Sequence, residues 1–287
     1  MADTPPIDDP NATLRAAHEK KTSAVRVQIV ELTRFLFTVG LLALLIRSLI
    51  FAPFNIPSES MLPRLLVGDY LFVSKWPYGY SRFSFPFGLV PIDGRLFDHA
   101  PRRGDILVFK YPKDNSQDFI KRVIGLPGDL IQMRDGQLIL NGKPVPKVRV
   151  EDFVTRQSPN TTCRGQIGAR DFHWVAPDGS RWCRYPRYRE TLPNGRSYDV
   201  LDQTTSVGDN TSVYVVPQGH YFMMGDNRDD SADSRFALAQ DGVGFVPEEN
   251  LVGRAAMIFF STDGSAEWLK PWTWLTAARF ERIGQRF

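Results

Sequence analysis

Residues 118–145 read DFIKRVIGLPGDLIQMRDGQLILNGKPV, and they indicate the fold class that we expect for the chain. In the second half of this stretch, apolar residues alternate with polar ones around Asp135-Gly136 and Asn141-Gly142, the dipeptides favoured in two-residue β-hairpins. Other short runs rich in β-branched and aromatic residues, such as GDYLFVSK and RAAMIFF, are typical of strands. The sequence therefore predicts a mostly β fold, with antiparallel strands in a barrel-like or sandwich-like domain.

The composition is that of a folded protein without a nucleic-acid surface. The 287 residues are 43% hydrophobic and 12% aromatic, too apolar for a disordered chain. The net charge is +3, and Lys and Arg are scattered along the sequence rather than gathered into one basic stretch. We therefore expect no nucleic-acid partner.

An apolar run precedes the β-rich part. Residues 34–54 (RFLFTVGLLALLIRSLIFAPF) match the roughly 20 residues that cross a bilayer. Arg47 interrupts the run toward its C-terminal end, where a long side chain can reach the membrane interface. A buried core helix and a cleavable signal peptide are the alternatives, but the run is long and Ala52-Pro53 leaves no A-x-A cleavage pattern. We predict one uncleaved transmembrane helix over 34–54.

The Lys and Arg residues around this run predict the orientation of the chain. Arg64 stands alone in the roughly 20 residues after Phe54, whereas the residues before Phe35 include Lys20, Lys21, Arg26 and Arg34. The positive-inside rule then places 1–33 in the cytoplasm and everything from Asn55 onward on the outer side of the membrane.

The amino-acid composition of the exported part changes along its length. Residues 146–208 are polar and rich in Arg, Pro and Asn, and we interpret them as a smaller lobe inserted into one β domain that comprises 55–145 and 209–262. The lobe holds both cysteines, Cys163 and Cys183. Outside the cytoplasm they can form a disulfide, and two free thiols are the alternative.

Two aromatic stretches have the composition of membrane-interface segments. Residues 76–91 contain six aromatic side chains in a sequence broken by Gly and Pro, and residues 263–287 end the chain with three Trp and three Arg. Burial in a core is the usual explanation for aromatic residues, yet Trp and Tyr beside cations also suit a bilayer surface. We expect 263–287 to be a membrane-proximal segment and the lipid bilayer to be a partner.

Excluding the common hydrolase motifs leaves a lysine as the candidate general base. No H-E-x-x-H and no G-x-S-x-G occurs, and Pro63 stands where a Ser-x-x-Lys pattern starting at Ser60 needs its lysine. Strand alternation puts Lys121 on one face with Phe119 and Val123, both apolar. A buried lysine loses solvation and can become a neutral base near pH 7, although a snorkelling or salt-bridged lysine is far commoner. The residues alone do not pair Lys121 with Ser60.

Five short motifs occur in the order found in bacterial type I signal peptidases, and together with the apolar run they resemble that family of membrane-anchored Ser/Lys proteases. They are IPSESMLP (56–63), GDYLFVSK (68–75), RRGDILVFKYP (102–112), FIKRVIGLPGD (119–129) and MMGDNRDDSADSR (223–235). The resemblance extends from the apolar run to about Phe260.

The resemblance implies a role for each matched residue. Ser60 corresponds to the nucleophile and Lys121 to its general base. The Ser58 hydroxyl and the Ser60 backbone N–H correspond to an oxyanion hole, and Ser231 to the residue that orients the lysine. The other matched positions divide into structural support, with Arg122, Asp233 and Arg235, and a shallow apolar substrate pocket, with Ile56, Pro57, Met61 and Ile120.

By resemblance, the chain is a single-pass protein of the bacterial inner (plasma) membrane. Its catalytic domain lies on the periplasmic or extracellular side and cleaves signal peptides from exported preproteins after the small residue of an A-x-A pattern, with no cofactor and no metal. Glu59 and Arg64 depart from the family pattern, and we expect them to be tolerated if they face solvent.

Two other classes of protein share part of this pattern. A self-cleaving Ser/Lys regulator has a similar pair of residues but needs no membrane span. A membrane-tethered β-rich binding module accounts for the apolar run, the strands and the aromatic residues, but it leaves the two serines and Lys121 unexplained. Reaction with a serine-directed acylating probe separates the binding module from the two peptidases.

Overall fold

The computed structural model describes residues 10–88, 90–163, 172–267 and 269–287. Part of the expected cytoplasmic segment (1–9) and part of the expected inserted lobe (164–171) therefore lie outside the described residues. The chain divides into two compact units, one ending at Arg47 and the other comprising Ser48–Phe287.

The first unit is a single long helix. Helix α1 spans Pro10–Leu45 and is followed by one π-helical turn, Ile46–Ile50. Residues Arg26–Ile50 have a mean hydropathy of 2.1 and are long enough to cross a membrane, which fits a single-pass anchor. The predicted limit of the span, 54, was too late because Phe51–Asn55 forms strand β1 instead. Pro53 lacks an N–H and ends the helix, and it is tolerated in β1 because β1 is an edge strand.

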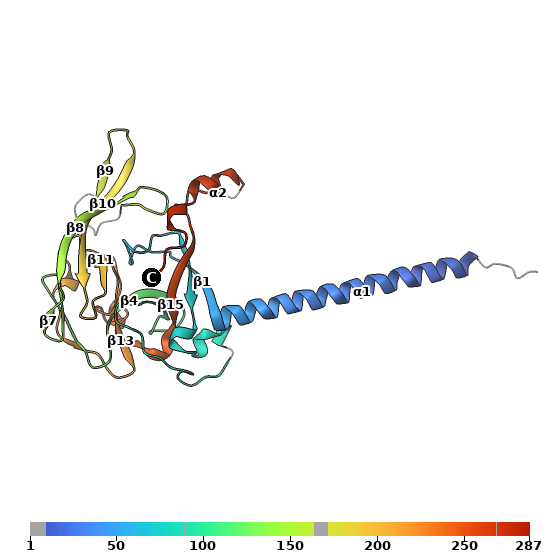
Figure 1. The fold of residues 1–287 in the computed structure, drawn as a ribbon, viewed down its shortest axis with the longest axis horizontal. Helices are drawn as coiled ribbons and strands as arrows, with labels where there is room; N and C mark the ends of the chain where they lie inside the picture. The colour runs from blue at the N-terminus through green and yellow to red at the C-terminus, as the bar shows by residue number, and fades with distance from the viewer. Residues whose placement is uncertain (1–9, 89, 164–171, 268) are drawn as a thin grey trace, which may run out of the picture. The chain divides into compact units, whose positions relative to one another are not determined.

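The second unit is built on a seven-stranded antiparallel sheet, of which β1, β4, β13 and β15 are labelled in Figure 1. Its order is β1, β2 (Asp69–Ser74), β15 (Leu251–Ser261), β3 (Ile106–Lys110), β4 (Asp118–Gly125), β13 (His220–Met224) and β14 (Val246–Pro247). Strand β15, close to the C-terminal end of the sequence, pairs with β2 on one side and with β3 on the other. The sheet is therefore complete only when both ends of the second unit are in place.

A second sheet contains the hairpins that the sequence predicted. It comprises β12 (Tyr214–Val215), β5 (Leu130–Arg134), β6 (Gln137–Leu140) and β7 (Lys143–Pro144), in that order. The Asp135-Gly136 turn joins β5 to β6, and the Asn141-Gly142 turn joins β6 to β7. All four turn residues have positive φ, between 47° and 75°, as the favoured two-residue hairpin turn requires. The predicted mostly β, antiparallel fold is confirmed.

The described residues of 146–208, the predicted smaller lobe, form a sheet of their own. Strands β8 (Lys147–Arg156), β10 (Arg181–Thr191) and β11 (Ser197–Leu201) pair in the order β11, β10, β8, and β9 (His173–Val175) pairs with β10. Cys163 and Cys183 form a disulfide. Cys183 and Tyr185 of β10 are fully buried against Leu62 and Leu66, which follow the predicted nucleophile in the chain.

The connections and the end of the chain contain short helices. Single 3-10 turns occur at Trp76–Tyr78, Arg82–Ser84, Pro86–Gly88, Val207–Asp209, Leu238–Gln240, Glu248–Asn250 and Phe280–Arg282, and helix α2 spans Trp272–Ala277. Arg282 is buried and donates to both carboxylate oxygens of Asp69, at 2.8 and 2.5 Å. By contrast, Trp272 and Leu275 of α2 are 66% and 70% exposed. The C-terminal segment is thus tied to the sheet while it keeps apolar side chains at the surface.

We expect the disulfide to stabilise the unit Ser48–Phe287, because it restricts the conformations that the unfolded chain can adopt. Replacing Cys163 and Cys183 with Ser should lower the free energy of unfolding by about 3 kcal/mol, the value for a loop with this separation of 20 residues. Denaturant unfolding of the full chain in detergent, followed by Trp fluorescence, measures the change. Reductant should bring wild type to the value of the double variant and leave that variant unaffected. Identical midpoints for all samples contradict the prediction.

Candidate active site

The segment after β1 carries the two predicted serines. Ile56 is held in place by two backbone hydrogen bonds, its N–H donating to the Asp69 carbonyl at 2.8 Å and its carbonyl accepting from Gly68 N–H at 3.0 Å. Beyond it, Ser58 is exposed whereas Ser60 is 6% exposed. Their hydroxyl oxygens lie 3.3 Å apart. The chain thus turns from an exposed hydroxyl to a buried one within three residues.

Strand β4 brings Lys121 to Ser60 across 61 positions of sequence. Lys121 Nζ donates to Ser60 Oγ at 2.8 Å and to the Ile120 carbonyl at 3.0 Å. Lys121 is only 3% exposed, and its Nζ lies 5.5 Å from the centre of the Phe119 ring. The structure therefore places a hydroxyl and an amine in direct contact in a site with little access to water.

Burial makes this amine far less basic than an ordinary lysine. Loss of solvation lowers the pKa of Lys121 from 10.5 to about 8, and the carboxylates of Asp233, Asp230 and Asp226 offset part of that effect. A neutral amine is accordingly accessible close to physiological pH. The Lys121 amine can then accept a proton from the hydroxyl in contact with it.

The loop 225–235 supports the segment that carries Glu59 and Ser60. The Asn227 N–H donates to the Ser60 carbonyl at 3.1 Å, and Asn227 Nδ2 donates to the Glu59 carbonyl at 3.2 Å. Within the loop, Arg235 Nε and Nη2 donate to Asp233 at 2.9 and 3.0 Å, and the side chains of this pair are completely buried. Burial by itself would raise the pKa of Asp233, but Arg235 and backbone N–H groups hold it below its ordinary value. The carboxylate therefore stays charged and keeps the loop closed.

Ser231 lies in this loop close to the other predicted residues. It is 8% exposed, and within the part of the chain that the structure describes its Oγ has no hydrogen-bond partner. A Cβ added at Gly225 would lie 2.5 Å from both Ser231 Cβ and the Ser60 carbonyl oxygen, so Gly225 brings these two residues together. Orientation of Lys121 by Ser231 stays a prediction.

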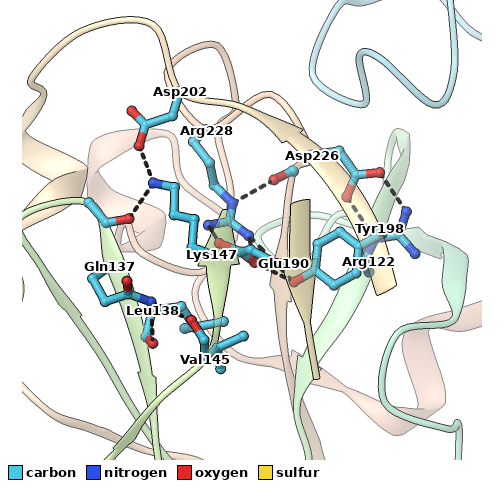
Figure 2. A network of polar contacts seen from close by, with 12 residues as sticks. Arg122, Gln137, Leu138, Val145, Lys147, Glu190, Tyr198, Asp202, Asp226 and Arg228 are labelled. Carbon is cyan, nitrogen blue, oxygen red and sulfur yellow. Dashed lines mark hydrogen bonds and ion pairs between the residues drawn. The ribbon is translucent and has the colours of Figure 1, made fainter. Parts of the chain in front are cut away.

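A network of buried charges joins this loop to the inserted lobe (Figure 2). Arg122 donates to Asp226 through Nε and Nη2, at 2.7 and 2.6 Å. Arg228 donates in the same forked manner to Glu190 of β10, at 2.7 and 2.6 Å, and the Tyr198 hydroxyl donates to Glu190 at 2.7 Å. Figure 2 shows Tyr198 between the two ion pairs, and the Arg122 guanidinium lies 4.3 Å from the centre of its ring. The loop is thus held by the large sheet on one side and by the lobe on the other.

Several of these supporting residues were not predicted from the sequence. The contacts of Asn227 with the segment around Ser60 and of Arg228 with the lobe were missed. The polar motif GDNR was the one available signal for them. Glu190 and Tyr198 lie in the polar lobe sequence, where nothing distinguishes them from neighbouring charged and aromatic residues.

The predicted apolar pocket residues lie together, with one exception. Ile56, Met61 and Ile120 belong to one buried cluster, at 3%, 0% and 9% exposure, whereas Pro57 is exposed. Arg64 faces solvent as expected, but Glu59 is 8% exposed and does not.

One group of carboxylates has a spacing suited to a metal ion. Carboxylate oxygens of Asp202, Asp209 and Asp229 lie within 4.8 Å of one another. Lys147 forms an ion pair with Asp202, so the protein supplies a cation to this group itself (Figure 2).

Comparison with known proteins assigns the fold and site to a family. The sequence profile described as "Signal peptidase, peptidase S26" matches residues 29–260. The chain belongs to this family. The signal peptidase I of Rickettsia conorii is 38% identical over 264 residues, covering 84% of this chain and 87% of the relative. That of Rickettsia canadensis is 37% identical over 287 residues, covering 92% and 96%.

A crystal structure of a signal peptidase I from Enterococcus faecalis is also similar, with 26% identity, a TM-score of 0.28, and coverage of 54% of this chain and 97% of that one. Membership of the signal peptidase family confirms the resemblance seen in the sequence motifs. It also confirms the enzyme class, a serine peptidase of the signal peptidase I type.

The close approach at Gly225 gives a test of this geometry in the signal peptidase. Gly225→Ala should lower kcat at least 100-fold, because the new methyl group displaces the Ser60 carbonyl, and misplacement by about 1 Å has this effect. Cleavage of a preprotein in detergent measures it, with near-UV circular dichroism to check folding. The matched control is Gly40→Ala, where an added Cβ meets nothing within 4 Å. Equal activity of the folded Gly225→Ala variant contradicts the geometry.

Proposed function

We propose that this signal peptidase removes N-terminal signal peptides from exported preproteins with Ser60 as the nucleophile and Lys121 as the general base. The observation that carries the proposal is the 2.8 Å contact between Lys121 Nζ and Ser60 Oγ at a site where Lys121 is 3% exposed. A pKa of about 8 suits a base that works near neutral pH.

The reaction proceeds by acyl transfer in two halves. Ser60 Oγ attacks the scissile carbonyl carbon while Lys121 Nζ takes the hydroxyl proton, and Lys121 then gives that proton to the nitrogen of the leaving mature chain. The signal peptide is left as an ester on Ser60. In the second half, Lys121 takes a proton from water, the water oxygen attacks the ester carbon, and the proton returns to Ser60 Oγ.

Two groups suit an oxyanion hole for both halves. Ser58 Oγ lies 3.3 Å from Ser60 Oγ, so its hydroxyl is close to the carbon under attack. The Ser60 N–H has no hydrogen-bond partner among the described residues, which leaves it available to the developing negative charge. The Ser60 carbonyl, in turn, is fixed by Asn227. We propose that Ser58 Oγ and Ser60 N–H together stabilise the tetrahedral intermediate.

The apolar surface beside Ser60 supports cleavage after a small residue. Ile56, Met61 and Ile120 are already packed in one cluster with little exposed area, which leaves room for a small side chain of an A-x-A pattern and not for a large one. Pro57 borders this surface and is exposed. An extended substrate can lie as an added strand beside the edge of the sheet.

The bilayer is the second partner in this proposal. The helix within Arg26–Ile50 anchors the chain, and the basic residues before it place the N-terminus in the cytoplasm and residues from Asn55 onward on the periplasmic or extracellular side of the bacterial inner membrane. Trp76, Trp272 and Leu275 are 47%, 66% and 70% exposed and suit contact with the membrane interface. Within the exported part, 146–208 acts as a lobe that supports the catalytic domain of 55–145 and 209–262.

Removal of either reacting group tests the assignment. Ser60→Ala and Lys121→Met should each lower kcat by at least about 10⁴-fold, as residues that act as a unit do. The measurement is cleavage of a preprotein with an A-x-A signal, in detergent. Lys113→Met is the matched control, because Lys113 is exposed and pairs only with the exposed Asp241. Full activity of Ser60→Ala shows that the nucleophile is misassigned, with Ser58 as the next candidate.

The pH dependence tests the role of Lys121 separately. Its neutral form is the base, and protonation below a pKa of about 8 removes that form, so kcat/KM should fall about tenfold per pH unit on the acidic side and level off above the pKa. Initial rates in buffers of constant ionic strength measure the profile. A profile that is flat across neutral pH rules out Lys121 as the titrating base.

A further inference from the structure

A cavity of about 620 Å³ lies between the large sheet and the sheet of the inserted lobe. Its lining includes Ile106 of β3, Ala255 of β15, Phe153 of β8 and Tyr198 of β11, and neither Ser60 nor Lys121 lines it. The cationic residues of the lining are all arginines, contributed by three strands and two connecting segments. They are Arg64, Arg122, Arg187, Arg189, Arg196 and Arg254.

The carboxylates near the cavity do not balance these six guanidinium groups. Arg122 takes both oxygens of Asp226, and Arg196 donates to Asp105 at 2.6 Å. Asp199 is shared, accepting from Arg187 at 3.3 Å and from Arg189 at 2.7 Å. Three carboxylates therefore serve four arginines, and the other two arginines have no carboxylate partner among the described residues.

The first of these two, Arg254, occupies a position where an unpaired charge is costly. It lies in β15, between β2 and β3, with the fully or almost fully buried Gly253 and Ala255 on either side. Within the described part of the chain its Nε is buried and makes no hydrogen bond. A buried donor of a charged group without an acceptor costs free energy that the strand would avoid with almost any other residue.

The second, Arg64, lies at the rim of the cavity. It donates to the Arg286 carbonyl, and its guanidinium is 4.9 Å from the centre of the Phe287 ring. The pKa of Arg64 is lowered, first by burial and then by repulsion from Arg122 and Arg282, although Asp226 and Asp199 offset part of that effect. A negative charge placed in the cavity would be attracted by all of these guanidinium groups at once.

We propose that this cavity is a binding site for a phosphate group. Phosphate carries about −1.5 to −2 charges at neutral pH and three or more acceptor oxygens, which suit forked donors that converge from different elements. Arginine binds such oxyanions in a bidentate manner, and the cavity contains arginine as its sole cationic residue type among the described residues. A carboxylate brings one charge and would leave one of the two unpartnered guanidinium groups without a counter-ion.

Two sources can supply this phosphate. A soluble phosphate or diphosphate is one, and the headgroup of an anionic phospholipid is the other, since the chain has an apolar helix long enough to anchor it in a bilayer. The apolar residues Ile106, Ala255 and Phe153 in the lining can accept the organic part of a larger phosphate ester.

The test is a binding titration of the full chain in a neutral detergent. Inorganic phosphate and pyrophosphate are titrated by calorimetry, with sodium chloride at equal ionic strength as reference, and mixed micelles with phosphatidylglycerol are compared with phosphatidylcholine micelles by thermal unfolding. The variants are Arg254→Gln and Arg64→Gln. The control is Arg181→Gln, which removes the same charge from an exposed position of β10 outside the cavity.

We expect wild type and Arg181→Gln to bind the phosphate probe equally, and each cavity variant to bind at least about tenfold more weakly. A response to inorganic phosphate or pyrophosphate identifies a soluble ligand; a rise in Tm of about 2–4 °C with phosphatidylglycerol alone, lost in Arg254→Gln, identifies a lipid headgroup. No binding of either probe, or equal weakening by Arg181→Gln, overturns the proposal. Arg64 is at the exposed rim, so Arg64→Gln keeps the test valid if Arg254→Gln fails to fold.

Discussion

The Lys121 amine, enclosed beside the Ser60 hydroxyl, is the constraint on which the rest of the unit Ser48–Phe287 depends. A charged ammonium group in such a place loses most of its hydration, and only strong support from the surrounding chain keeps the lysine there instead of letting it turn toward solvent. The apolar side chains of β3 and β4 exclude water from the amine. The nearby Asp233, Asp230 and Asp226 limit the fall of its pKa, so that the amine remains a useful base.

The loop 225–235 illustrates how that support is arranged. Its own closure comes from the buried pair of Asp233 and Arg235, and its position comes from pairs that reach outward, from Asp226 to Arg122 of the large sheet and from Arg228 to Glu190 of the lobe. Each pair is forked and desolvated, a geometry that fixes orientation as well as distance. The lobe therefore also helps to position the loop, because Glu190 of the lobe pairs with Arg228 of the loop.

Sequence reasoning succeeded where the determining interactions are local or where several motifs occur together. The Asp135-Gly136 and Asn141-Gly142 turns were predictable because the backbone conformation of two residues fixes the hairpin. The proximity of Ser60 and Lys121 was not predictable from either residue, and it came only with the order of five motifs.

The role of a residue could not be predicted from the sequence where that role depends on a partner far away in the chain. Glu190 is one acidic residue in a polar segment, and its importance comes entirely from Arg228, which lies far away in the chain. The burial of Glu59 was missed for a related reason, since a charged residue between two serines reads as solvent-facing until the turn is known. The predicted span continued past the end of the helix because hydropathy does not distinguish the apolar edge strand Phe51–Asn55 from a helix.

The position of β15 and of the residues beyond it has a consequence for the order of events in the life of the chain. Asp69, whose carbonyl holds Ile56, is bound by Ser261 and Arg282, 192 and 213 residues further on, and Glu59 is bound by Asn227, 168 residues further on. Such distant contacts form late in folding, because the entropy of closing long loops must be met first. Until the chain has been synthesised as far as Arg282, the segment around Ser60 lacks some of these neighbours. The site is therefore completed only at the end of synthesis, and a truncation that removes Arg282 would disturb it even though the cut lies far from Ser60 in the sequence.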